Sequence, residues 1–138
     1  MGGYRLLEHT ADMGIEANGE TLEELFAQSA FGLMEIIAVA PEARVRKEKG
    51  VTVQGGDREE LLVNWLNEVL YLFETGGFFP VDFEVEEVAG NRLRARVLGE
   101  PFDPQRHAVE REVKAVTHHR VLVERTNGLW YARVYVDL

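Results

Sequence analysis

Two carboxylates and the last residue of the chain are the groups in this sequence best suited to chemistry. Asp12 lies in a turn-like stretch near the start, and the chain ends in Val136, Asp137 and Leu138, which places a side-chain and a terminal carboxylate side by side. Oxygen donors of this kind suit a hard divalent cation, Ca²⁺ or Mg²⁺, better than zinc, which prefers imidazole or thiolate. If the first and last strands pair, Asp12, Asp137 and Leu138 meet in one metal site.

Plainer roles for the same groups are consistent with the residues alone. Asp12 shares its turn with His9 and precedes Met13 and Gly14, so its side chain could simply stabilise that turn. Asp137 could be a solvated residue at a strand end. Two aspartates and a histidine could also activate water in a small metal-dependent hydrolase, but no nucleophile–base pair or substrate-anchoring motif accompanies them. A regulatory binding module without metal is a third alternative.

Hydrophobic periodicity predicts the strands that must position these acids. Residues 130–136 carry apolar side chains at every second position, which is typical of a half-buried strand and puts Asp137 on its other face. Residues 4–8 predict a short strand before the Asp12 turn, and residues 15–17 a brief extended piece after it. Both ends of the chain are therefore expected to lie in one sheet.

Two amphipathic helices are predicted between the strands. The first begins at a capping box formed by Thr21 and Glu24, carries one apolar stripe and stops at Pro41. The second begins at Asp57, carries a wider apolar face that includes Trp65, and stops at a glycine pair. Trp65 is expected to be a core residue.

The remaining segments predict further strands. An Asn-Gly turn leads into the last strand, and the other β segments are 45–54, which is interrupted at its Lys-Gly pair, a hairpin of 81–88 with 93–98, and 109–125. The prediction is an α+β fold of two layers, in which two amphipathic helices cover one face of a largely antiparallel sheet.

Composition narrows the classes of protein further. The chain has 138 residues and no cysteine, which fits one soluble domain over residues 1–138 and excludes disulfides and Cys-ligated metal centres. It contains neither an apolar run of membrane-spanning length nor a secretory h-region, so we expect a cytoplasmic protein. With 24 acidic against 15 basic residues, the net charge of −9 argues against a broad nucleic-acid-binding surface.

Three histidines have plain and functional interpretations. His118 and His119 are neighbours on a predicted strand and so point to opposite faces, which favours one buried and one exposed ring. His107 lies in a Pro-flanked loop, where it could touch a phosphate, although a surface histidine is the simpler expectation.

Polar residues near the predicted helix and strand faces are ambiguous. Asn67 and Glu68 adjoin the apolar stripe of the second helix, where they could hold a loop or meet a partner. Lys114 could contact a partner or the acidic cluster, or be a solvated strand residue. The roles of these three residues, and those of His9 and His119, stay open from sequence.

Four stretches of the chain, taken together, resemble the signature stretches of the archease family. They are residues 9–15 (HTADMGI), 61–68 (LLVNWLNE), 112–119 (EVKAVTHH) and 136–138 (VDL). Each stretch alone is weak, but four in the right order at the right distances span essentially the whole chain. His118 stands where tyrosine is most often expected, a departure that affects no proposed ligand.

The resemblance implies a function and a metal site. Archeases are small acidic accessory proteins of the RtcB-type tRNA-splicing RNA ligase, which implies a non-catalytic activator that promotes guanylylation and multiple turnover of the ligase and could broaden its nucleotide use. It also implies a divalent metal held by Asp12, Asp137 and Leu138, with Ca²⁺ expected in isolation and Mg²⁺ or Mn²⁺ as further candidates in function. Direct nucleic-acid binding and membrane association are not expected.

Overall fold

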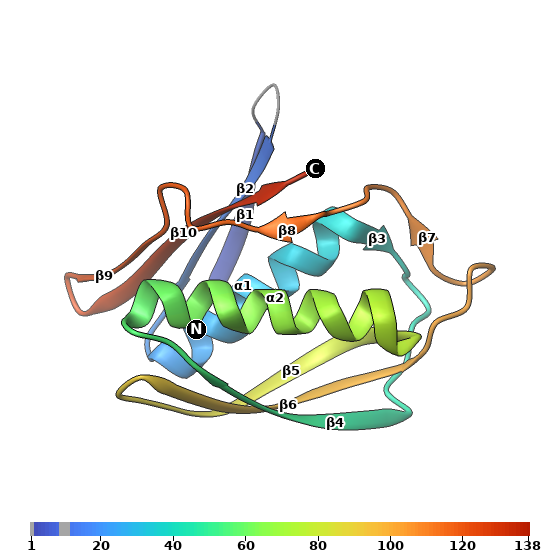
Figure 1. Cartoon of the computed structure of the whole chain (residues 1–138), viewed down its shortest axis with the longest axis horizontal. Coiled ribbons are helices and arrows are strands. Elements are labelled where there is room, and N and C mark those ends of the chain that lie inside the picture. Colours follow the sequence, from blue (N-terminus) through green and yellow to red (C-terminus); the bar gives the residue numbers. More distant parts are fainter. Residues whose placement is uncertain (1, 9–11) are drawn as a thin grey trace.

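Two helices lie between two antiparallel sheets. The computed structural model describes residues 2–8 and 12–138. Figure 1 shows α1 (Leu22–Ile37) and α2 (Arg58–Gly76) sandwiched between a sheet that holds both chain ends and a second sheet on the opposite side. No helix in the described part of the chain is long and apolar enough to cross a membrane.

The sheet that holds the chain ends is built mainly on two long strands. β2 (Asp12–Gly19) lies between β1 (Gly3–Glu8) and β10 (Leu129–Asp137), and all of these pairs are antiparallel. The far side of β10 pairs with two short strands, β8 (Ala115–Val116) and β9 (Leu122–Thr126).

The second sheet has the strand order β4-β6-β5. Its members are β4 (Lys47–Gln54), β5 (Phe78–Ala89) and β6 (Arg92–Pro101), paired antiparallel throughout. A small ladder of β3 (Ala38–Val39) with β7 (Ala108–Val109) closes one end of the molecule.

Local chemistry sets the helix ends, as the sequence predicts. The Thr21 hydroxyl accepts a hydrogen bond of 3.1 Å from the backbone N–H of Glu24 at the start of α1. The Asp57 carboxylate accepts one of 2.8 Å from the N–H of Glu60 at the start of α2. Gly77 ends α2 with φ of 60°, the left-handed conformation that glycine adopts without strain.

The predicted α+β class, with largely antiparallel strands and two helices, is confirmed. The structure adds detail to the predicted layers: the strands form two main sheets, and the two helices lie between them and cover one face of each. Three local predictions were wrong. The first helix ends at Ile37, before Pro41; β4 runs unbroken through Lys49 and Gly50; and the 109–125 segment is mostly loop around three short strands.

The pairing of β10 with β2 determines which side chains face the helices. On the inner face Val134 lies opposite Ile15 and Val136 opposite Met13, and all four are buried. The alternate residues of both strands point to the outer face, away from α1 and α2. The sequence suggests that the first and last strands pair with each other. In the structure they do not, because β2 lies between β1 and β10.

Candidate functional site

Asp12 and Asp137 are direct cross-strand partners. They form the last pair of the β2–β10 ladder, and because side chains of an antiparallel pair share a face, both carboxylates point to the outer face. Asp137 is exposed and Asp12 half-buried. Cross-strand Cβ atoms lie about 4.5–5.5 Å apart, so the two carboxylates can approach one cation. The predicted meeting of the two acids is therefore found, with β2 as the partner strand.

The end of the chain is held in place beside this pair. Leu138 is half-buried and packs against the hydrophobic core. The carbonyl oxygen of Asp137 accepts a hydrogen bond of 2.8 Å from the backbone N–H of Lys114, and Ala115 pairs with Asp137 in the short β8 ladder. These contacts fix the position of the last residue relative to Asp12.

Glu16 lies on the same outer face of β2 as Asp12, but it has basic and hydroxyl partners. Glu16 bonds the Arg5 guanidinium and accepts a 2.6 Å hydrogen bond from the Tyr131 hydroxyl. The Tyr131 hydroxyl, followed by Arg5, lowers the pKa of Glu16, while burial and the Glu16 hydrogen bond raise the pKa of Tyr131 to about 12. In the described part of the chain neither Asp12 nor Asp137 has such a basic partner.

The two carboxylates are donors that suit a hard cation, and the described residues add no third side-chain ligand to them. Over residues 2–8 and 12–138, no group of three or more His, Asp or Glu side chains gathers at one point. Two like charges placed directly opposite each other repel, which a divalent cation would relieve. A terminal carboxylate at Leu138 would add a further oxygen. The expected neighbour His9 lies outside the described residues.

Asn67 positions the strand that contacts the acid pair. Its side-chain amide donates to the Val116 carbonyl over 3.0 Å, and its carbonyl oxygen accepts from the Val116 N–H over 2.9 Å. β8 lies at an edge of its sheet, where no further strand pairs with its outer side, so the Asn67 amide satisfies the Val116 N–H and carbonyl that would otherwise lack a backbone partner. Asn67 therefore fixes β8 to α2, which is the loop-holding role that the sequence left open.

An aromatic cluster lies next to the acid pair on the outer face. Tyr135 pairs with Gly14, two positions along the ladder from Asp137 and Asp12 and therefore on the same face. A Cβ at Gly14 would lie 2.7 Å from the Tyr135 ring, so the ring packs directly on the β2 backbone. The His119 ring is centred 6.3 Å from the Tyr135 ring, and the Arg120 guanidinium lies 5.8 Å from the ring centre.

The predictions for the two adjacent histidines and for His107 need correction. His118 and His119 are both exposed in a turn that follows β8, so they do not divide between two strand faces. Thr117 bonds the Tyr135 carbonyl through both its N–H (2.9 Å) and its hydroxyl (3.1 Å), and the turn that follows is closed by a bond of 3.3 Å from the Val121 N–H to the His118 carbonyl. His107 is 1% exposed instead of lying on the surface.

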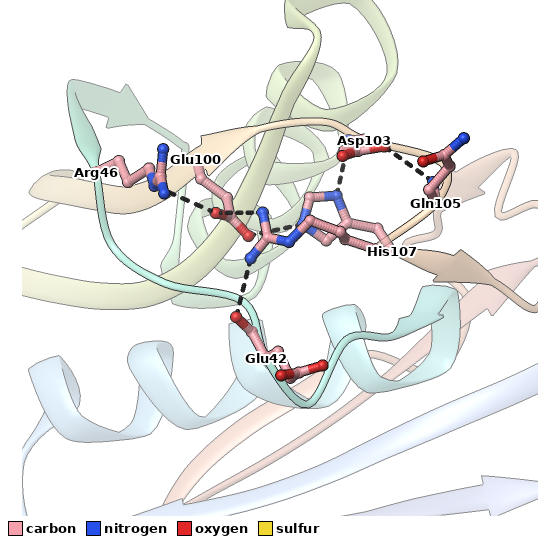
Figure 2. A network of polar contacts seen from close by, with 7 residues as sticks. Glu42, Arg46, Glu100, Asp103, Gln105 and His107 are labelled. Carbon is pink, nitrogen blue, oxygen red and sulfur yellow. Dashed lines mark hydrogen bonds and ion pairs between the residues drawn. The ribbon is translucent and has the colours of Figure 1, made fainter.

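His107 belongs to a polar network formed around the loop between β6 and β7 (Figure 2). Its ring stacks on Phe79 with centroids 4.0 Å apart, and Nδ1 accepts from the Asp103 N–H over 2.9 Å. An accepting Nδ1 places the proton on Nε2, which donates to Glu100 over 2.8 Å. Hydrogen bonds from Arg106 first, and then His107, lower the pKa of Glu100 to about 2.

The remaining candidates have plain positions. Trp65 is fully buried and donates its indole N–H to the Phe26 carbonyl over 2.9 Å, which confirms it as core. Glu68 is half-buried on α2, and Lys114 is exposed beside β8. Arg120 is the residue near the site that sequence reasoning missed, because its unusual backbone conformation leaves no signal in the sequence.

Fold and site together define a small α+β protein with an oxygen-rich cross-strand pair on the helix-free face of a sheet. The chain belongs to the archease family. Residues 4–138 match the model of the "Archease protein family (MTH1598/TM1083)".

Sequence relatives and solved structures cover nearly the whole chain. "Protein archease" of Methanosarcina mazei is 39% identical over 139 residues, covering 98% of this chain and 95% of that one. "Protein archease" of Pyrococcus furiosus is 40% identical over 135 residues, covering 95% of each.

The fold is also that of known archease structures. The solution structure of Methanobacterium thermoautotrophicum protein 1598 superposes with a TM-score of 0.83 at 33% identity, covering 99% of each chain. The crystal structure of a Thermotoga maritima protein described as "an archease, possible chaperone" gives 0.65 at 25% identity, covering 96% of this chain and 94% of that one. The predicted family is thus confirmed.

Proposed function

We propose that this protein is a non-catalytic activator of an RtcB-type tRNA-splicing RNA ligase, and that it acts by presenting a divalent cation between Asp12 and Asp137. The observation that carries the proposal is the register of β10 on β2, which makes these two acids direct partners on an exposed face. Membership of the archease family supports the choice of partner. Leu138, which is half-buried and packs against the core beside Asp137, would supply a terminal oxygen.

Each residue of the site has a separate task in this proposal. Asp12 and Asp137 bind the cation, and the backbone contact of Lys114 with Asp137 keeps the end of β10 in register. A bound cation would supply positive charge to the phosphate oxygens of the ligase's nucleotide during guanylyl transfer. Ca²⁺ is the expected ion for the isolated protein, with Mg²⁺ or Mn²⁺ as candidates in the complex.

The overall charge suits a protein partner. A net charge of −9 favours approach to a basic RNA-binding enzyme by complementary steering, without contact to the RNA itself. In the described part of the chain, the outer face of the β2–β10 pair is not covered by a helix, so the site is open to such an enzyme. A cytoplasmic location follows from this partner and remains part of the proposal.

The metal part of the proposal is tested with Asp12→Asn, which removes the charge and keeps the shape. Without metal the variant should be as stable as the wild type or slightly more so, because a like-charge pair is removed. With Ca²⁺ at a hundred times its Kd, linkage predicts about 2.7 kcal/mol for the wild type, or a Tm rise of about 9 °C for a chain of this length. The variant should lose that rise.

The activation part is tested with the ligase, GTP and Mn²⁺. Wild-type protein should produce guanylylated ligase and multiple turnover, whereas Asp12→Asn and Asp137→Asn should not. Glu124→Gln is the matched control, since Glu124 is an exposed acid of β9 in the same sheet. Unchanged stimulation by both aspartate variants would refute the mechanism. Water-dependent hydrolysis by the protein alone would instead support the metal-dependent hydrolase, and activation without any metal binding would support the metal-free module.

A further inference from the structure

Arg120 has a backbone conformation that its residue type does not favour. Its φ is 57°, in the left-handed region where an arginine Cβ crowds the following carbonyl oxygen. In the described part of the chain, the other non-glycine residue with positive φ is Asn127, at 54°, in the β9–β10 turn. Asparagine tolerates that conformation and is common in such turns. Local turn chemistry therefore explains Asn127 and does not explain Arg120.

The sheet beneath holds the strained turn in place. The carbonyl oxygen of Arg120 accepts hydrogen bonds from Nε and Nη2 of Arg133, over 3.2 and 3.1 Å. The N–H of Val121 donates to the His118 carbonyl over 3.3 Å, which closes the turn. Strained backbone persists only where its surroundings over-determine it, and such positions concentrate at functional sites.

The turn presents its cationic side chain beside the acid pair. The Arg120 guanidinium lies 5.8 Å from the centre of the Tyr135 ring, and the exposed His119 ring lies 6.3 Å from it. Tyr135 and Asp137 are alternate residues of β10, so this aromatic platform is displaced about 7 Å along the strand from the two carboxylates.

The charge of the segment differs from that of the rest of the chain. Residues 113–123 contain Lys114, His118, His119 and Arg120 and no acid, although the chain as a whole has 24 acidic residues. A pair of carboxylates that suits a cation thus adjoins an acid-free segment that suits an anion. A ligand that carries both a metal ion and phosphate oxygens matches this arrangement.

We infer that His119 and Arg120, held on Tyr135, form an anion subsite for the polyphosphate of a nucleotide whose metal ion is held by Asp12 and Asp137. The inference rests on the proposed function, because it assumes the cation at the acid pair. A single-stranded RNA is the other phosphate-bearing candidate. A net charge of −9 disfavours a long polyanion and leaves the compact nucleotide as the better ligand.

The strain separates this inference from a purely structural role. If Arg120 served only to brace the Tyr135 ring, its removal would lower stability. If it is kept for ligand binding, glycine at 120 should relieve the strained φ and leave stability unchanged or higher. Asn127→Gly is the matched control, because Asn127 is the other non-glycine residue with positive φ in the described part of the chain, and it lies in the β9–β10 turn.

The experiment uses the full chain with Ca²⁺ and inorganic triphosphate as the probe, followed by calorimetry. Triphosphate should bind the wild type in the presence of Ca²⁺, and Arg120→Gly should weaken that binding about tenfold, the worth of one charge-assisted hydrogen bond. Arg120→Gly should retain the wild-type affinity for Ca²⁺ alone and a Tm at or above the wild-type value. Asn127→Gly should leave all three quantities unchanged.

Several outcomes would overturn the inference. They are equal triphosphate affinity of Arg120→Gly and wild type, a lower Tm for Arg120→Gly, no triphosphate binding by the wild type, and tighter binding of a single-stranded RNA oligonucleotide than of triphosphate. Loss of the anion subsite with Ca²⁺ binding intact would leave the proposed activator function standing. If the wild-type protein does not bind Ca²⁺ at all, the proposed metal site itself is refuted.

Discussion

Asn67→Ala should destabilise the protein and loosen the strand that contacts the acid pair. Two hydrogen bonds are lost, at 3.0 and 2.9 Å, and both leave a backbone group of Val116 without its partner. At roughly 1 kcal/mol net for each bond, and more where the groups left behind stay buried, the cost is about 2–4 kcal/mol. A chain of 138 residues unfolds with an entropy of about 0.29 kcal/mol/K, so the Tm should fall by about 7–14 °C.

A second asparagine on the same helix provides the control. Asn64 makes one exposed hydrogen bond of 2.8 Å to the Gln54 carbonyl, so Asn64→Ala should cost no more than about 1 kcal/mol. Asn67→Asp keeps an acceptor for the Val116 N–H and loses the donor to its carbonyl, which should give an intermediate Tm.

Calorimetric unfolding measures the global effect, and amide hydrogen exchange at Ala115, Val116 and Thr117 measures the local one. Exchange at these amides should accelerate in Asn67→Ala beyond what the lower global stability explains. If Asn67→Ala unfolds within 1 °C of Asn64→Ala, or if β8 exchanges as in the wild type, the amide does not fix this strand and the reasoning is wrong.

Three further predictions concern packing, pH and the chain end. Gly14→Ala places a Cβ 2.7 Å from the Tyr135 ring, so it should lower the free energy of unfolding by about 1–3 kcal/mol in denaturant titrations. Gly50→Ala has open space around the new Cβ and should not lower it. Because the Arg106 hydrogen bond is the largest cause that lowers the Glu100 pKa to about 2, the stabilisation from Glu100 is complete above its ordinary value of 4.5. This stabilisation should be lost as the pH falls from 4.5 towards 2, and a Tm that stays flat over this range would contradict it. A tag fused to Leu138 should weaken Ca²⁺ binding and ligase activation more than an N-terminal tag does, and equal effects would exclude a terminal ligand.

Features with local causes could be predicted from the sequence. The hydroxyl of Thr21 and the carboxylate of Asp57 cap the two helices because capping depends on residues only three positions away. The β9–β10 turn forms at Asn127 and Gly128 because both residues tolerate positive φ. The alternation of the last strand predicted its inner face, and Ala132, Val134 and Val136 are buried on it.

Features that depend on distant partners could not be predicted. The burial of His107 requires the Phe79 ring and the Glu100 carboxylate, which are cross-strand partners in the β5–β6 ladder, and the loop between β6 and β7 brings the imidazole against them. The division of the strands into two sheets is a matter of long-range pairing, because alternation in one strand does not name its neighbour. The left-handed backbone of Arg120 also depends on a distant partner, because the side chain of Arg133 on β10 donates a hydrogen bond to the Arg120 carbonyl.

The two faces of the β2–β10 pair separate stability from chemistry. On the inner face Met13 and Val136 are buried against the helices, so a polar replacement there would cost core packing. On the outer face the adjoining pair is Asp12 with Asp137, and like charges directly opposite each other in a ladder are destabilising. A cation bound by the pair, as proposed above, would offset this repulsion. The inner pair holds the ladder in register, and through that register it keeps the two carboxylates together.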